Sequence, residues 1–153
     1  GYVNSGTIGV SAGTVTITDD SATGSFTMDM NTLKVGLTAT KPGKEGALEG
    51  HLKKADFFDV AKFPRATFAS TDIRAGGLEK ATHTITGNLE LHGAKKSIAF
   101  PATIAIAGDT VTATSEFSIN RKDFGMVYPG MKDNLIRDNV LIKLHVNAKR
   151  AAR

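Results

Sequence analysis

The feature that most constrains this chain is an alternation of apolar and other side chains, every second residue, that returns along most of its length. Residues 24–30 show it clearly, because Phe26, Met28 and Met30 fall on one face of an extended segment. Successive side chains of a strand point to opposite sides, so each such segment predicts a strand with one buried face. The segments that show the pattern are residues 7–10, 14–18, 24–30, 67–74, 83–92, 97–107, 111–119 and 139–149.

Turn residues separate these segments. The clearest hairpin signal is Gly-Asp at residues 108–109, because it lies between two alternating segments. Residues 19–21 and 76–77 mark two further turns. Short strands joined by tight turns predict an all-β antiparallel fold, in which residues 14–18 and 24–30 pair with their apolar faces inward. The pattern does not distinguish a barrel from a sandwich.

Two residues interrupt the alternation. Gly87 occupies the apolar face of its segment, which predicts a bulge or a place where another group approaches the backbone closely. Pro101 falls on the outward face and lacks an N–H group, so we expect it at an edge or a bulge of the sheet.

One segment has a helical period instead. Leu48, Leu52 and Ala55 lie at i, i+4 and i+7, which predicts a short helix over residues 47–55. Four of the eight phenylalanines follow, between positions 57 and 68. A helix followed by large aromatic side chains, in a chain of strands, suggests a plug or lid over one end of an apolar interior. The alternative is that these aromatic side chains are ordinary core.

Several motifs follow one another in a fixed order along the chain. They are His51-Leu52, Asp56-Phe57-Phe58-Asp59, Phe63-Pro64 and Thr67-Phe68, followed by residues 85–93, 117–126 and 135–140. Together they resemble the YceI-like family over nearly the whole chain. The resemblance implies a lipocalin-like antiparallel β-barrel of about eight strands with one short helix or lid segment. It also implies a bacterial protein, periplasmic or secreted, that holds a polyisoprenoid or an isoprenoid quinone.

The resemblance sets the expected domain organisation. Residues 1–150 form a single barrel domain, and residues 151–153 form a basic tail. Family members carry one further strand before this point, so the first strand of the domain is missing or unrecorded in this chain. The sequence shows no signal peptide.

Composition argues against several other classes of protein. The 153 residues suffice for one domain with a core, and no apolar run approaches the roughly 20 residues of a membrane helix. The absence of cysteine excludes disulfides and thiolate chemistry. The net charge of +4 is either a solvated basic surface or an attraction to anionic lipid surfaces. Tryptophan and nucleic-acid motifs are absent, so we expect no nucleic-acid partner.

The sequence holds no persuasive catalytic or metal-binding constellation. The four histidines are far apart and lack the spacing of metal ligands. Asp56 and Asp59 flank a pair of phenylalanines, but helix termination and turn formation explain them more simply than acid–base chemistry. We therefore expect no metal, no cofactor and no enzymatic activity.

The alternation also selects candidate ligand-binding residues. Seven side chains are expected on the inward face, and four more around an opening. The inward set is Phe26, Met28, Phe68, Leu89, Phe100, Phe117 and Leu144, and the set at the opening is Phe57, Phe58, Met126 and Tyr128.

The loop that begins at Arg121 has two interpretations. In the first, Arg121 and Asp123 pair and cap the turn. In the second, Arg121 or Tyr128 contacts the polar head of a ligand, while Met126 and Tyr128 line the entrance, because such side chains adapt to irregular apolar ligands.

The leading functional hypothesis is a carrier, store or sequestering protein for a long-chain apolar lipid. A barrel of about eight strands either fills with side chains or holds one ligand. Small inward residues such as Ala113 and Ser115 leave room for a ligand. The alternatives are an enzyme acting on a lipid or quinone in the same pocket, and a stress-response or structural module with a filled core. We expect transient contact with a membrane surface, and the sequence leaves homodimer formation open.

Overall fold

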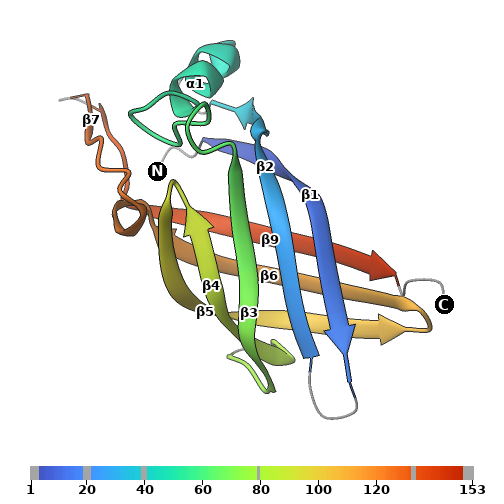
Figure 1. Ribbon diagram of the computed structural model, residues 1–153. Coiled ribbons are helices and arrows are strands. Elements are labelled where there is room, and N and C mark those ends of the chain that lie inside the picture. The colour runs from blue at the N-terminus through green and yellow to red at the C-terminus, as the bar shows by residue number, and fades with distance from the viewer. Residues whose placement is uncertain (1–3, 19–21, 39–40, 79, 132–133, 150–153) are drawn as a thin grey trace.

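The computed structural model describes residues 4–18, 22–38, 41–78, 80–131 and 134–149. Seven strands form one antiparallel sheet in the order β1-β2-β3-β4-β5-β6-β9, and β7 pairs with β8 in a separate ribbon (Figure 1). The elements are β1 (Ser5–Ile17), β2 (Ala22–Leu37), α1 (Glu45–Leu52), β3 (Arg65–Ala75), β4 (His83–Leu91), β5 (Ala94–Ala107), β6 (Thr110–Asn120), the 3₁₀ helix η1 (Arg121–Phe124), β7 (Gly130–Met131), β8 (Asn134–Leu135) and β9 (Asn139–Lys149).

The sheet curls into a nearly closed barrel, which confirms the expected antiparallel barrel with one helix. Strands β6 and β9 lie across strands β1 to β4 in Figure 1. In the described part of the chain, β1 pairs with β2 and β9 pairs with β6, so β1 and β9 are the two outer edges of the sheet. Seven strands are described where about eight were expected, and the further strand stays a prediction.

Strand β5 joins the two halves of the barrel because it changes partner along its length. Ala102 still pairs with His83 of β4, whereas Thr103 pairs with Thr114 of β6. Pro101 was expected at an edge or a bulge. It pairs in register with Thr84 of β4 without a bulge, and only its other side, before the pairing with β6 begins at Thr103, lacks a partner strand among the described residues. The β5–β6 hairpin then closes at Gly108, whose φ of 60° suits glycine in a tight turn.

The inward side chains meet in a continuous row of aromatic rings. Phe26 stacks on Phe68 with the ring centroids 5.3 Å apart, and Phe68 lies 5.5 Å from Phe100. Phe100 stacks on Phe117 at 4.3 Å, which extends the row to β6. Aromatic rings at such separations add stabilisation beyond the area that they bury. The row therefore ties β2, β3, β5 and β6 together through the middle of the barrel.

Gly87 of β4 makes room for this row. A Cβ atom at Gly87 would lie 2.4 Å from Cζ of Phe68 and 2.5 Å from the carbonyl oxygen of Ala69. Its partner in β3 is Ser70, and the pairing of β3 shifts between Ser70 and Asp72. Both features expected from the glycine are thus present: the close approach is made by the Phe68 ring, and the bulge lies on the neighbouring strand.

The structure differs from the sequence prediction in two elements. The helix covers Glu45–Leu52 rather than residues 47–55, and the residues after it form hydrogen-bonded turns. The strands expected at residues 7–10 and 14–18 form one long strand, β1, in which every residue is exposed. The apolar face of β1 was expected to be buried, but Val10, Val15 and Ile17 are 48%, 37% and 49% exposed.

Gly87→Ala should destabilise the barrel because its methyl group would collide with Phe68 and with backbone of β3. Overpacking of this kind costs roughly 1–3 kcal/mol of unfolding free energy. Chemical denaturation measures the change. The control is Gly46→Ala in α1, where nothing lies within 4 Å of the added Cβ. That variant should keep or raise stability, by up to about 1 kcal/mol. Equal stability of the two variants would contradict the assignment.

Candidate functional site

The inward rows are buried at one end of the barrel and exposed at the other. Met30, Ala66 and Ile119 lie at the end covered by α1 and η1, and their exposed fractions are 2%, 1% and 8%. At the opposite end, Ile17 and Ile106 are 49% and 62% exposed. We call these the capped end and the open end. The capped end comprises α1, η1 and residues 53–64 and 125–130, and the open end comprises residues 76–82 and 108–109.

A cluster of three rings closes the capped end. The ring centroid of His51 in α1 lies 5.1 Å from Phe57 and 5.3 Å from Tyr128, and Phe57 lies 5.4 Å from Tyr128. The cluster therefore joins the helix, the turn that follows it and the loop after η1. Nε2 of His51 also lies 3.6 Å from a carboxylate oxygen of Asp56.

This packing differs from the opening expected around Phe57, Phe58, Met126 and Tyr128. Phe57 is 5% exposed and Met126 is 3% exposed, and Phe58 packs against the core. The four side chains thus belong to a closed cap in this structure. Periodicity identified them as a group at one end of the barrel, but could not show that they fill that end. Their contact with a ligand stays a prediction.

Two carboxylates attach α1 to the barrel. Hydrogen bonds from its own backbone and from the Thr38 hydroxyl lower the pKa of Glu45. A hydrogen bond from Lys53, followed by one from the backbone of Val35, lowers the pKa of Glu49. The helix has eight residues and no side-chain N-cap. Its position thus depends on these contacts as well as on its own helical propensity.

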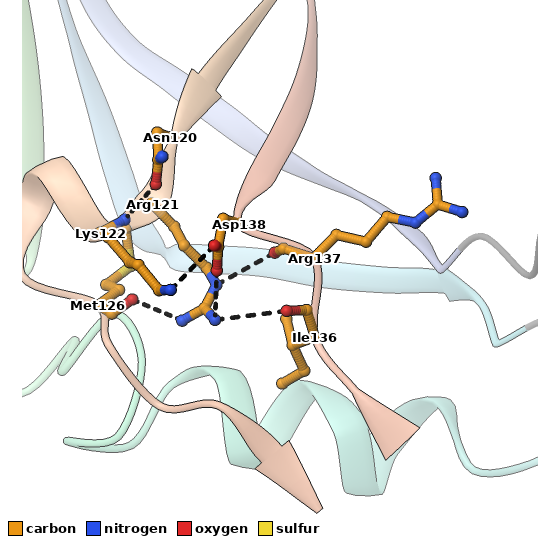
Figure 2. A network of polar contacts seen from close by, with 7 residues as sticks. All are labelled: Asn120, Arg121, Lys122, Met126, Ile136, Arg137 and Asp138. Atoms are coloured by element: carbon orange, nitrogen blue, oxygen red, sulfur yellow. Dashed lines mark hydrogen bonds and ion pairs between the residues drawn. The ribbon is translucent and has the colours of Figure 1, made fainter. Parts of the chain in front are cut away.

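Arg121 fixes the loop after η1, as Figure 2 shows. Its side chain is 3% exposed. The guanidinium group donates hydrogen bonds to the carbonyl oxygens of Met126 at 2.6 Å, Arg137 at 3.1 Å and Ile136 at 3.5 Å, and it pairs with Asp138 at 3.1 Å. One buried cation therefore holds both ends of the segment between η1 and β9.

This network replaces the pair expected between Arg121 and Asp123. The partner is Asp138, which is 17 residues away in the chain, so local sequence could not identify it. The head-group contact of Arg121 stays a prediction, but the guanidinium group would have to give up backbone partners to make it. Asn120 caps η1 instead, by accepting a hydrogen bond from the backbone N–H of Lys122 at 2.9 Å.

The carboxylate of Asp138 makes the network sensitive to acid. A hydrogen bond from Lys122, assisted by the charges of Lys122 and Arg121, lowers the pKa of Asp138 below its ordinary value. A carboxylate with a lowered pKa contributes stability above its unfolded pKa of about 3.9. That contribution is lost as the pH falls through the lower pKa of the folded state.

A cavity of about 440 Å³ lies at the open end, between the β3–β4 loop and strands β5, β6 and β9. It is open to the outside, and polar side chains such as Thr114 and Glu116 line it together with apolar ones. Leu144, one of the predicted ligand-binding residues, contributes to its wall, and Ser115 lies beside Phe117 in the same inward row. Its lining residues are Leu78, Lys80, Ala81, Pro101, Ala102, Thr103, Thr114, Ser115, Glu116, Lys143 and Leu144.

The residues predicted to face inward do so. All seven belong to the core or pack directly against it, although their contact with a ligand stays a prediction. Phe68, Leu89 and Phe100 are buried, and Phe26, Met28, Phe117 and Leu144 are partly buried. The sequence prediction placed Ile106, which is 62% exposed, on an inward row, but it did not single out Leu78, which is 78% exposed at the open end. Leu78 could have been noticed in the sequence, because it is a large apolar residue in a segment predicted to be a turn.

The described residues hold no group of three or more histidine, aspartate or glutamate side chains that could bind a metal ion. Among the same residues, no helix has the length and apolar character to cross a membrane.

The fold and the site define an antiparallel β-barrel with an apolar interior, closed by a helical cap at one end. The chain belongs to the YceI-like family, because the profile of the YceI-like domain matches residues 3–148. This confirms the resemblance seen in the sequence motifs.

Curated relatives agree with this assignment. A UPF0312 protein of Pseudomonas putida strain W619 is 33% identical over 99 residues, which cover 61% of this chain and 50% of the relative. A UPF0312 protein of Enterobacter sp. strain 638 is 46% identical over 59 residues, covering 39% of this chain and 29% of the relative. The aligned region thus spans about half the length, or less, of these relatives.

Solved structures share the fold at low sequence identity. Burkholderia cenocepacia BcnA is 22% identical with a TM-score of 0.71, over 90% of this chain and 83% of that chain. A Campylobacter jejuni YceI protein is 16% identical with a TM-score of 0.70, over 95% and 85% of the two chains. A polyisoprenoid binding domain from Saccharophagus degradans, implicated in plant cell wall breakdown, is 14% identical with a TM-score of 0.64, over 93% and 84%.

Arg121→Lys should loosen the cap although it keeps the charge, because an ammonium group cannot reach the carbonyl oxygens that the guanidinium group now binds. Hydrogen bonds to charged groups contribute roughly 1.5–3 kcal/mol each, so we expect an unfolding free energy lower by at least that amount. Hydrogen exchange should accelerate in residues 125–138. Lys122→Gln is the control, because its partly exposed ion pair is worth at most about 1 kcal/mol. Similar losses in both variants would count against the assigned role.

Asp138→Asn should reduce the acid sensitivity of the protein. The wild type should lose stability as the pH falls below about 4, where the carboxylates become protonated. The variant lacks the contribution of Asp138 at every pH, so its unfolding midpoint should fall less over the same interval. Thermal unfolding measured between neutral pH and pH 3 tests this. Parallel curves for the two proteins would exclude a role for Asp138.

Proposed function

We propose that this chain binds one long-chain apolar lipid in the barrel interior, for carriage, storage or sequestration. The observation that carries the proposal is the gradient of burial along the inward rows. The capped end is filled, whereas Phe117, Ile142 and Leu144 keep partial exposure, and Leu144 lines the cavity. An apolar interior that opens to the outside on one side has the form of a binding site rather than of a completed core.

The hydrophobic effect supplies the binding energy. Each methylene group removed from water contributes about 0.8 kcal/mol, so a chain of several isoprene units gains enough to hold without strong polar contacts. The name of the Saccharophagus degradans domain supports a polyisoprenoid as the ligand. An isoprenoid quinone is the second ligand class in the proposal, because its tail has the same chemistry.

The proposal is for binding without catalysis. Thr38 and Arg121 are the buried polar side chains of the described residues. The Thr38 hydroxyl contacts Lys41 and Glu45, and the Arg121 guanidinium group is held by the loop, so neither offers a reactive group to the interior. Turnover of a bound lipid or quinone by the purified protein would favour the enzyme hypothesis instead.

The proposal also places the protein in the periplasm or outside a bacterial cell, on the strength of the family resemblance alone. Fractionation of its host, with detection of the protein by antibody, tests this location. Recovery in the cytoplasmic fraction alone would reject it.

The first experiment is extraction of lipid from protein purified from its own host, followed by mass spectrometry. A stoichiometric lipid with an isoprenoid chain is the expected result. Protein that carries no lipid, and that takes up neither a polyprenol nor a quinone in vitro, would support the module with a filled core.

Phe117 and Phe100 form a matched pair for a test of the interior. They stack on each other, but Phe100 is 2% exposed and Phe117 is partly exposed. Phe100→Ala should cost the roughly 3–5 kcal/mol typical of a close-packed core. Phe117→Ala should cost at or below the low end of that range, and should change the lengths of the retained chains. Phe117→Arg should abolish lipid retention, because an unpaired charge is strongly disfavoured in an apolar interior.

Unfolding midpoints and bound lipid should be measured on the same preparations. Equal stability losses for both alanine variants, in a protein that carries no lipid, would remove the basis of the proposal.

A further inference from the structure

Large apolar side chains are exposed around the open end of the barrel. Leu78 in the β3–β4 loop is 78% exposed, and Ile106 near the β5–β6 turn is 62% exposed. Leu78 also lines the cavity of about 440 Å³, together with Ala81 and Leu144. Ile106 pairs with Val111 and continues the inward row that contains Ile104.

These side chains are an extension of the apolar interior to the surface. A single exposed leucine is common on a soluble protein, but apolar side chains that surround the opening of an apolar interior indicate a contact surface. A ligand that leaves this cavity would meet Leu78 in its wall, and Ile106 lies three residues beyond Thr103 of the same wall, further along the β5–β6 hairpin.

The charged side chains at this end are mixed in sign. Lys80 follows the turn that holds Leu78, and Lys149 pairs with Thr110 beside the β5–β6 turn, where Asp109 supplies a carboxylate. A lysine next to an inserted apolar side chain can keep its methylene groups in the apolar region while its ammonium group binds the lipid phosphates. Charges of both signs suit zwitterionic head groups better than a strongly anionic surface.

Among the described residues, the other end of the barrel offers no comparable passage. Phe57, Phe124 and Met126 are 5%, 2% and 3% exposed, and Arg121 holds the loop that covers them. A chain molecule could pass there only if the cap came apart.

From these observations we propose that the open end docks on the surface of a zwitterionic phospholipid bilayer. Leu78 and Ile106 insert among the head groups, and the ligand passes directly between bilayer and barrel. This inference rests on the proposed function, because it assumes that the interior takes a lipid. It adds the surface that docks, the bilayer as its partner, and the open end as the place where the lipid enters the barrel.

The test measures the transfer of a fluorescent prenyl lipid from phosphatidylcholine vesicles that contain a quenching lipid. Three proteins are compared: the wild type, the double variant Leu78→Asp with Ile106→Asp, and Val127→Asp. Val127 is the matched control, because it is a 64% exposed apolar side chain at the capped end. The same probe is also delivered from dilute detergent, which measures binding without a bilayer, and unfolding midpoints confirm that all three proteins fold.

We expect the wild type and Val127→Asp to take up the probe from vesicles at the same rate, and the double variant to be slower by about tenfold, the effect of losing even one inserted aliphatic side chain. Leu78 also lines the cavity, so the vesicle rate of each protein is divided by its rate of binding from detergent, and this ratio should fall only in the double variant. Partial replacement of phosphatidylcholine by phosphatidylglycerol should leave the three rates in the same order.

The remaining outcomes each overturn a defined part of the proposal. Equal vesicle rates for all three proteins, with normal binding from detergent, would reject docking at the open end and keep the proposed function. An equal slowing by Val127→Asp would also reject it. If uptake requires phosphatidylglycerol and the double variant takes up the probe as fast as the wild type, docking depends on charged side chains elsewhere on the surface. No binding of the probe from either source would reject both the docking and the proposed function.

Discussion

The structure depends on the contact between Phe100 and Phe117. Backbone pairing joins β5 to β6 only from Thr103 and Thr114 towards the turn, since the earlier part of β5 pairs with β4. Where that pairing is absent, the stacked rings at 4.3 Å hold the two strands together. The sheet can therefore bend at β5, between the strands β1 to β4 and the strands β6 and β9, without opening the core. The position of this bend sets the shape of the interior.

The aromatic row also separates two regions with different physical properties. On the side of the cap, large apolar side chains such as Met30 and Phe124 are almost fully buried, and the buried guanidinium group of Arg121 satisfies the carbonyl oxygens of the covering loop. Buried polar groups are costly without partners, so a fully paired arginine makes the loop definite in position. On the other side, the same inward rows continue with partial exposure, and this is the region where we propose that a ligand binds without disturbing the cap.

The cavity therefore lies away from the end where the sequence predicted an opening. The aromatic and methionine side chains near α1 have the composition of an entrance, but they form the closed end. The type of a side chain shows what it can contact. Whether it lines an opening depends on the free volume that the neighbouring side chains leave beside it. In this barrel the space lies beside the β3–β4 loop and the middle of strands β5, β6 and β9.

The sequence by itself determined the strands, most of the turns and the face of each strand that points inward, because a period of two residues is a local property of the chain. It also singled out Gly87, which has no side chain, and Pro101, which has no backbone N–H, as positions that differ from those of a regular strand. It could not determine how deeply each inward residue is buried. Met30 and Ile106 both belong to inward rows, yet one is 2% exposed and the other 62%. That difference, and the pairing of Arg121 with Asp138 across 17 residues, arise when the sheet curls and brings distant segments together, so only the tertiary structure decided which end of the barrel is closed.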